Sequence, residues 1–374
     1  MSTPRSLGLT DQVRPVKIHT PRGAFAALEA QPGTGVCERR PALLIPGFTG
    51  SKEDFISILQ PLASAGRRVV AIDMRGQYQS QGAPDETGYA PGELAADIAA
   101  MGDAIAADGQ GLHLVGHSLG GHIAREATLA REARIISLTL LSSGPGRITG
   151  QRAQILRGML AIMATADRDG STAKDARAAK DGVAKDARAA KNDSTAGNDD
   201  RPGLAESASP ADERLRATVG KIWDEHLGPQ AKADGVPESM IAFLHERMMG
   251  NSPTGLVAMG KYLLACPDRT TQLASLDGPP ILVLYGENDD AWRPAVQERM
   301  ARRLSASRVC IPGAGHSPAV EAPETTASTL TAFWKTAENR ERQRAFQAAR
   351  GAQSGPAAWP AAAPGSATGA KASA

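Results

Sequence analysis

The sequence is poor in the features that would assign a protein to a specialised class by composition alone. It has three cysteines, Cys37, Cys266 and Cys310, which form neither a CxxC pair nor a spacing typical of a metal site. Aromatic residues make up 4% of the chain, and the formal net charge is +2. This balance of charge indicates neither nucleic acid nor an anionic membrane as a partner. We therefore expect free thiols in a reducing cytoplasm, without a bound metal or other cofactor.

Long apolar runs are also missing. No segment has the length of a membrane span, and the first residues lack the apolar core of a signal peptide. With 41% apolar and 22% charged residues, the 374-residue chain resembles an average globular protein. We expect a cytoplasmic protein of one large or two ordinary domains, and nothing in the sequence indicates its oligomeric state.

Short apolar runs alternate with helical patterns over most of the chain. Two runs around Thr20-Pro21-Arg22-Gly23 predict a hairpin at a sheet edge. Further runs predict buried strands at 42–45, 69–72, 112–115, 135–141, 281–285 and 308–311. Strands that alternate with helices imply a mostly parallel central sheet with helices on both faces, so the predicted fold class is α/β.

This alternation is interrupted by a long segment without a clear strand, which we interpret as an inserted helical cap. Within it lies a low-complexity tract in which Lys-Asp-Ala-Arg-Ala-Ala-Lys occurs twice. The tract has almost no apolar side chain larger than alanine, so we expect it to be disordered or partly helical. The predicted organisation is a mobile arm at 1–14, a core at 15–146 and 271–338, a cap at 147–270 with the insert at about 168–212, and a disordered tail at 339–374.

One stretch joins a buried strand to a helix through a turn of small residues. It reads Leu112-His113-Leu114-Val115-Gly116-His117-Ser118-Leu119-Gly120-Gly121 and centres Gly-x-Ser-x-Gly on Ser118. In a sharp strand-to-helix turn the two elements pass close together, so the neighbours of the tip must be small. The turn holds the serine hydroxyl at the carboxyl end of a sheet, in front of a helix N-terminus. A tight turn without chemistry is the alternative interpretation.

With this turn in its context, the sequence resembles the alpha/beta-hydrolase superfamily, and within it the esterase- and lipase-like enzymes with a serine nucleophile and a helical cap. The resemblance covers about residues 14–337. It implies an alpha/beta-hydrolase core, Ser118 as nucleophile, and a catalytic triad in the chain order serine, acid, histidine. Dehalogenases and many epoxide hydrolases of this fold have an aspartate at the turn, so Ser118 argues against both.

The resemblance also implies the base and the acid. His316, the last histidine of the chain, lies in a glycine-rich loop before the final helix, where the family places its base. The acid is expected shortly after the strand that ends at Gly286, and the family spacing selects Asp289, with the adjacent Asp290 as the alternative. His117, inside the turn, is expected to pack against the sheet and away from the hydroxyl.

An oxyanion hole needs two backbone N–H donors. The resemblance implies those of Leu119 and of Phe48, in the loop after the strand at 42–45. A second loop, Asp73-Met74-Arg75-Gly76-Gln77-Tyr78-Gln79-Ser80, resembles the family pattern Asp-x-Arg-Gly-x-Gly-x-Ser, with Tyr78 in place of the second glycine. We interpret Asp73 and Arg75 as a charge pair that holds this loop.

Two amphipathic stretches of the cap are rich in methionine. Flexible thioether side chains adapt to varied apolar shapes, so we expect a substrate pocket lined by Met159, Met163, Phe243 and Met248, although they could serve only to pack the cap. The predicted function is hydrolysis of an ester or related acyl bond of a small apolar substrate through an acyl-enzyme. The alternatives are an acyltransferase or carbon–carbon bond hydrolase with the same triad, a cofactor-free haloperoxidase or perhydrolase, and a catalytically silent binding module.

Overall fold

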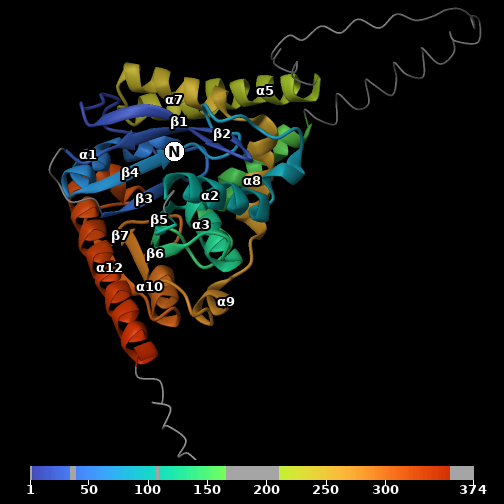
Figure 1. Ribbon diagram of the computed structural model, residues 1–374. Coiled ribbons are helices and arrows are strands. Elements are labelled where there is room, and N and C mark those ends of the chain that lie inside the picture. Colours follow the sequence, from blue (N-terminus) through green and yellow to red (C-terminus); the bar gives the residue numbers. More distant parts are fainter. Residues whose placement is uncertain (1, 34–38, 107–108, 166–209, 354–374) are drawn as a thin grey trace, which may run out of the picture.

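The computed structural model describes residues 2–33, 39–106, 109–165 and 210–353 (Figure 1). Nearly all of the low-complexity tract predicted at about 168–212 lies outside these residues. The last part of the predicted tail, 354–374, and Cys37 lie outside them as well.

A central sheet of eight strands organises the described chain. Its order is β1-β2-β4-β3-β5-β6-β7-β8. The strands are β1 (Val13–Thr20), β2 (Gly23–Ala30), β3 (Arg39–Ile45), β4 (Arg67–Ile72), β5 (Leu112–His117), β6 (Ile135–Leu141), β7 (Ile281–Gly286) and β8 (Ser307–Ile311). The β1–β2 hairpin is antiparallel and joins the sheet antiparallel to β4, whereas all pairings from β4 through β8 are parallel. The predicted α/β class with a mostly parallel sheet is confirmed.

Helices cover both faces of this sheet because successive residues of each strand point to opposite sides. In β3, for example, Leu43 and Ile45 belong to one apolar cluster, whereas Ala42 and Leu44 belong to the other. The helices of the first face are α2 (Pro91–Ile105), α3 (Leu119–Ala130) and α10 (Pro294–Arg303), and those of the second face are α1 (Ile56–Ser64), α11 (Pro318–Glu321) and α12 (Pro323–Gln353).

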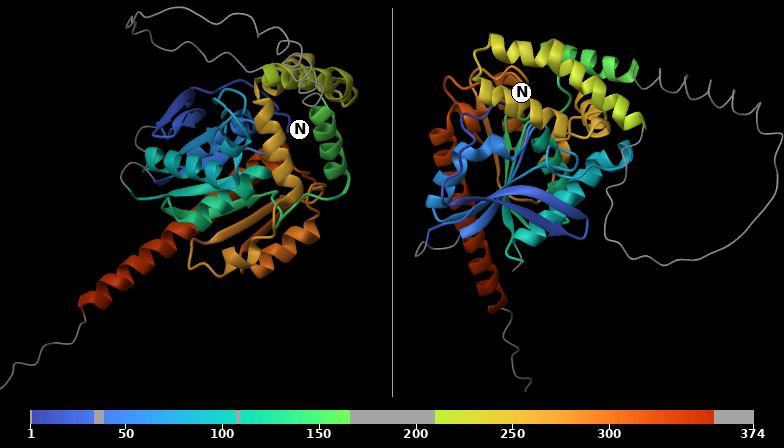
Figure 2. Two further views of the ribbon diagram at one scale, coloured as in Figure 1. Left: turned by 90° about the vertical axis from the view of Figure 1, so that its right-hand side faces the viewer. Right: turned by 90° about the horizontal axis from the view of Figure 1, so that it is seen from above.

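The described part of the predicted cap segment consists of helices joined by short turns. After a helix over 150–165 it comprises α5 (Pro210–Ile222), a π-helical turn at Trp223–Leu227, α6 (Gly228–Ala233), α7 (Glu238–Gly250), α8 (Pro253–Ala265) and α9 (Thr270–Ala274). Figures 1 and 2 show α5 and α7 lying across one end of the sheet. This is the carboxyl end of the parallel strands, because the cap's apolar cluster contacts Phe48, which follows β3.

Two details differ from the sequence-based organisation. The disordered tail was predicted to begin at residue 339, but α12 continues to Gln353, so the first part of that tail is helical. Its residues are mainly Ala, Glu, Arg and Gln, which are good helix formers, and Glu341 pairs with Arg134 of the core. The segment predicted to be a mobile arm is partly packed, since Pro4 is buried and the Ser2 carbonyl accepts a 2.6 Å hydrogen bond from Arg247.

The long helix α12 is anchored to the sheet by a buried polar network. The carboxylate of Glu338 accepts hydrogen bonds from Arg67 Nη1 (2.8 Å) and His113 Nε2 (3.2 Å), while His113 Nδ1 lies 2.7 Å from Ser137 Oγ. Trp334 stacks on the His113 ring at a centroid distance of 5.2 Å. Removal of one partner would leave buried groups uncompensated. Although α12 is long, no helix among the described residues is both long and apolar enough to cross a membrane.

We expect Glu338→Ala to lower the free energy of unfolding by about 3–5 kcal/mol, because Arg67 and His113 would lose their buried partner. Glu324→Ala is the matched control, since Glu324 is exposed on the first turn of the same helix and should contribute no more than about 1 kcal/mol. Urea denaturation measures both values. Equal effects of the two substitutions would show that the buried network does not anchor α12.

The same network should make the fold acid-sensitive. Burial lowers the pKa of His113 from 6.5 to about 4. Burial alone would raise the pKa of Glu338, but hydrogen bonds from His113 and Arg67 outweigh it and lower this pKa from 4.5 to about 2. Both groups have a lower pKa in the folded protein than in the unfolded chain, so the unfolded chain takes up each proton at a higher pH. The free energy of unfolding therefore falls as the pH drops from 6.5 through 4 because of His113, and as it drops from 4.5 toward 2 because of Glu338.

We expect the free energy of unfolding of the wild type to decrease between pH 7 and about 4, and to decrease less in His113→Gln, which lacks the titrating ring. Urea denaturation at several pH values measures both slopes. An identical slope in the two proteins would contradict the assignment to His113.

Candidate active site

The turn between β5 and α3 places Ser118 in a strained conformation. Its backbone angles are φ 53° and ψ −116°, outside the region that non-glycine residues usually adopt. A Cβ atom on Gly116 would lie 2.3 Å from the Gly120 carbonyl oxygen, and one on Gly120 would lie 2.5 Å from the Ile45 carbonyl oxygen. The glycines of the Gly-x-Ser-x-Gly pattern are therefore required by close backbone packing. Strain of this kind typically costs about 1–3 kcal/mol and is concentrated at functional sites.

Three segments that are distant in the sequence bring a serine, a histidine and an aspartate together. Ser118 Oγ lies 3.1 Å from His316 Nε2, and His316 Nδ1 lies 2.9 Å from Asp289 Oδ1. Ser118 follows β5, Asp289 follows β7 and His316 follows β8, so all three lie at the carboxyl ends of parallel strands. With Nδ1–H donated to Asp289, Nε2 is free to accept the hydroxyl proton of Ser118.

The two neighbouring aspartates have different surroundings. Asp289 is buried, and its oxygens accept hydrogen bonds from the Ala291 amide (2.9 Å) and from Gln297 Nε2 (2.8 Å). The Asp290 side chain is 63% exposed and forms an ion pair with Arg152 at 2.7 Å. Of the two candidates left by the sequence, Asp289 is the one that contacts His316. Gln297, on α10, was not identified from the sequence, because a buried glutamine eight residues from an aspartate has no distinctive pattern.

A second histidine supports the loop that carries His316. Burial, together with the nearby His316, lowers the pKa of His117 to about 3, so its ring is neutral. Because a carbonyl oxygen can only accept, His117 Nε2–H donates to the His316 backbone carbonyl at 2.8 Å. The expectation that His117 only packs against the sheet was therefore incomplete: it is a buried hydrogen-bond donor to the backbone of the proposed base.

The loop after β3 approaches Ser118 closely. A Cβ atom on Gly47 would lie 3.1 Å from Ser118 Cβ and 3.2 Å from His117 Nδ1. Phe48 follows in this loop, and Leu119 is the first residue of α3, whose amide has no partner within the helix. The two predicted oxyanion donors thus belong to the segments that flank Ser118.

The loop after β4 is not held by a charge pair between Asp73 and Arg75, as the sequence analysis had predicted. Asp73 accepts hydrogen bonds from the amide and from Nζ of Lys52, both at 2.8 Å, whereas Arg75 pairs with Asp97. Asp73 and Arg75 are therefore not partners of each other, because each finds an opposite charge on another segment. Tyr78 has a φ of 38°, a left-handed conformation that explains why glycine is usual at this position.

The four cap residues predicted to line a pocket gather in one apolar cluster. Met163, Phe243 and Met248 are buried in it, and Met159 packs against it together with Phe48 of the core. The cluster therefore reaches the loop beside Ser118. Ser118 itself is buried, with 8% of its surface exposed.

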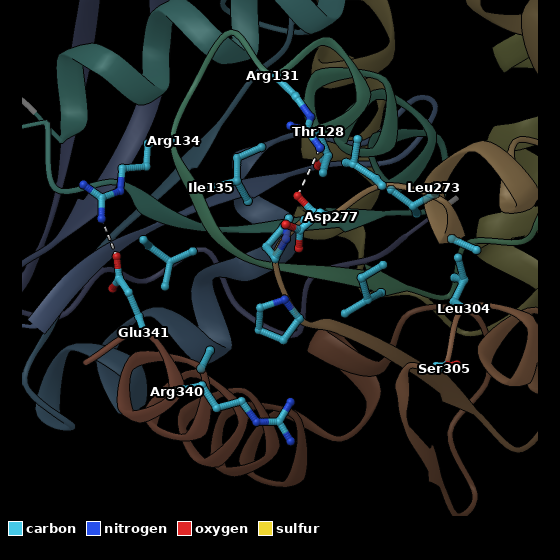
Figure 3. Close-up of a pocket in the computed structure, with 18 of the residues that line it drawn as sticks. Thr128, Arg131, Arg134, Ile135, Leu273, Asp277, Leu304, Ser305, Arg340 and Glu341 are labelled. Carbon is cyan, nitrogen blue, oxygen red and sulfur yellow. Dashed lines mark hydrogen bonds and ion pairs between the residues drawn. The ribbon is translucent and has the colours of Figure 1, made fainter. Parts of the chain in front are cut away.

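A separate cavity of about 530 Å³ lies far from these residues (Figure 3). It is lined by the starts of β6 and β7 and by α12, at the opposite end of the sheet from Ser118. Figure 3 shows Arg134 and Glu341 pointing toward each other there, and a 2.6 Å hydrogen bond joins them. Its lining contains no histidine or cysteine and none of Ser118, Asp289 and His316.

Among the described residues, no cluster of His, Cys, Asp or Glu side chains could hold a metal ion.

Comparison with known proteins supports the same family. A Variovorax paradoxus protein provisionally named carbamate hydrolase RutD is 38% identical over 109 residues, which cover 29% of this chain and only 40% of that protein. A Bacillus subtilis protein provisionally named 2-succinyl-6-hydroxy-2,4-cyclohexadiene-1-carboxylate synthase is 24% identical over 77% of this chain and 87% of its own length.

The fold has solved counterparts. A thermophilic esterase from Thermogutta terrifontis superposes with a TM-score of 0.53 at 21% identity, covering 87% of this chain and 99% of the esterase. The model of the alpha/beta hydrolase family matches residues 42–329, a range that includes Ser118, Asp289 and His316. The chain therefore belongs to the alpha/beta-hydrolase family, as the resemblance of its sequence implied.

Proposed function

We propose that this protein is a serine hydrolase that cleaves an ester or related acyl bond of a small apolar substrate through an acyl-enzyme. The observation that carries the proposal is the continuous hydrogen-bonded chain from Ser118 Oγ through His316 to Asp289. A serine hydroxyl is a weak nucleophile unless an adjacent base removes its proton during attack, and this arrangement provides such a base.

Each group has a defined role in the proposed reaction. Ser118 Oγ attacks the carbonyl carbon while His316 Nε2 takes its proton, and the buried Asp289 carboxylate stabilises the resulting imidazolium. His316 then gives the proton to the leaving group as the acyl bond breaks. In the second half, a water molecule attacks the acyl-enzyme with His316 again acting as base, and the carboxylic acid leaves.

The negative charge that develops on the carbonyl oxygen requires preorganised donors. The amides of Leu119 and Phe48 are our candidates, since one follows the nucleophile and the other lies in the loop that packs against it. Both donors are backbone groups, so the presence of Pro46 where the family often has histidine does not remove either of them.

The composition of the cap supports an apolar substrate. The apolar cluster that reaches Phe48 is rich in methionine: Met163, Met240 and Met248 are buried in it, and Met159 packs against it. An apolar wall of this kind favours small or medium apolar acyl groups over charged ones, because a charge would lose its hydration without gaining a partner. Among similar proteins, one is provisionally named a carbamate hydrolase and another is an esterase, and both names agree with cleavage of an acyl bond.

We expect Ser118→Ala to reduce kcat/KM for p-nitrophenyl butyrate by on the order of 10³-fold or more, because the triad acts as a unit. The melting temperature should not fall, since alanine removes only the hydroxyl oxygen. Turnover similar to that of the wild type in the purified variant would exclude Ser118 as the nucleophile.

Asp289→Asn and Asp290→Asn form a matched pair that tests the acid. We expect Asp289→Asn to lower kcat by about 10³–10⁴-fold, because the histidine would lose the partner that fixes its tautomer. Asp290→Asn breaks only the exposed ion pair with Arg152 and should leave kcat within about threefold. If the second substitution were the more damaging, the assignment of the acid would be reversed.

A further inference from the structure

The side chain of Gln77 connects the loop after β4 to the loop beside Ser118. Gln77 is fully buried, its Nε2 donates to the Gly47 carbonyl at 2.8 Å, and its Oε1 accepts from the Met74 amide at 3.1 Å. The Gly47 carbonyl also accepts from the Gly50 amide at 3.1 Å. This oxygen is therefore held from two directions.

The Gly47 carbonyl belongs to the same peptide group as the Phe48 amide. A trans peptide is planar, so its C=O and N–H bonds point in opposite directions. Fixing the direction of the Gly47 oxygen therefore fixes the direction of the Phe48 N–H, away from Gln77. We infer that Gln77 is a positioning residue that aims the Phe48 amide at the oxyanion of the reaction intermediate, an inference that rests on the proposed function.

A residue that fixes this peptide is needed because position 47 is occupied by glycine. A side chain at this position would press on Ser118 Cβ at 3.1 Å, so only glycine fits without displacing a neighbour. Glycine leaves the adjoining peptide free to rotate, because it accepts many backbone angles. The donors from Gln77 and from the Gly50 amide restrict that freedom together, and a hydrogen bond to the carbonyl also polarises the peptide and strengthens its N–H as a donor.

The position of Gln77 is itself well defined. Its amide donates to the Met74 carbonyl at 2.9 Å, and its carbonyl accepts from the Ser80 amide at 2.8 Å. The loop is tied to the core by Asp73, which accepts hydrogen bonds from Lys52. A rigid backbone holding a buried side chain is the arrangement expected of a group that supports a catalytic donor.

Three substitutions test this role. Gln77→Glu keeps the acceptor for the Met74 amide but replaces the donor to Gly47 with an oxygen, and Gln77→Met keeps the approximate volume but removes both polar atoms. Gln79→Met is the matched control, because Gln79 is exposed in the same loop. Each protein is assayed for kcat and KM with a p-nitrophenyl ester and with the corresponding thionoester, alongside its melting temperature.

Sulfur accepts hydrogen bonds poorly, so the thionoester benefits little from the oxyanion hole. For the oxoester we expect kcat to fall by about 10–100-fold in both Gln77 variants, somewhat less than for complete loss of a donor, with KM within about threefold. The thionoester should lose much less, and Gln79→Met should behave as the wild type. If Gln77→Glu does not fold, Gln77→Met still provides the comparison.

Equal losses for the two substrates would overturn the inference, because they would indicate a general distortion of the site. An unchanged kcat in the Gln77 variants would overturn it as well. Ser118→Ala, assayed in parallel, separates this failure from failure of the proposed function. If the wild-type activity does not depend on Ser118, both proposals fail, whereas Ser118-dependent activity that is indifferent to Gln77 contradicts only the inference.

Discussion

The strained turn at Ser118 is the constraint on which the proposed site depends. Its positive φ turns the chain sharply from β5 into α3 and leaves the hydroxyl at the carboxyl end of the sheet. The turn is possible only because Gly116 and Gly120 allow backbone contacts that no side chain could tolerate. The surrounding sheet and helices must supply the free energy that keeps this conformation populated.

The other groups of the site are held by buried polar contacts between segments far apart in the sequence. Gln297 fixes one oxygen of Asp289, His117 holds the backbone of His316, and Gln77 holds the peptide before Phe48. Buried hydrogen bonds of this kind are costly to break, because the partner left behind is then unsatisfied. They therefore restrict the site to one arrangement.

The strands and the proposed nucleophile could be predicted from the sequence because their signals are local. Apolar runs marked the strands, and glycine spacing marked the turn at Ser118. The choice between Asp289 and Asp290 could not be made from the residues alone, since it depends on which side chain faces His316. The helix was not expected to continue beyond residue 338 for a similar reason: the ion pair between Glu341 and Arg134 joins it to a distant segment, and such a pair has no signature in a single stretch of sequence.

The most direct test of the account is to identify the atom that forms the covalent intermediate. The wild-type protein is treated with a fluorophosphonate, digested, and analysed by mass spectrometry. The proposed mechanism predicts a single phosphonylated peptide, modified at Ser118, because this serine is hydrogen-bonded to a histidine that Asp289 orients. Ser137 also lies beside a histidine, His113, but it is fully buried. An unmodified Ser118 peptide, with the label absent or carried by another residue, would contradict it.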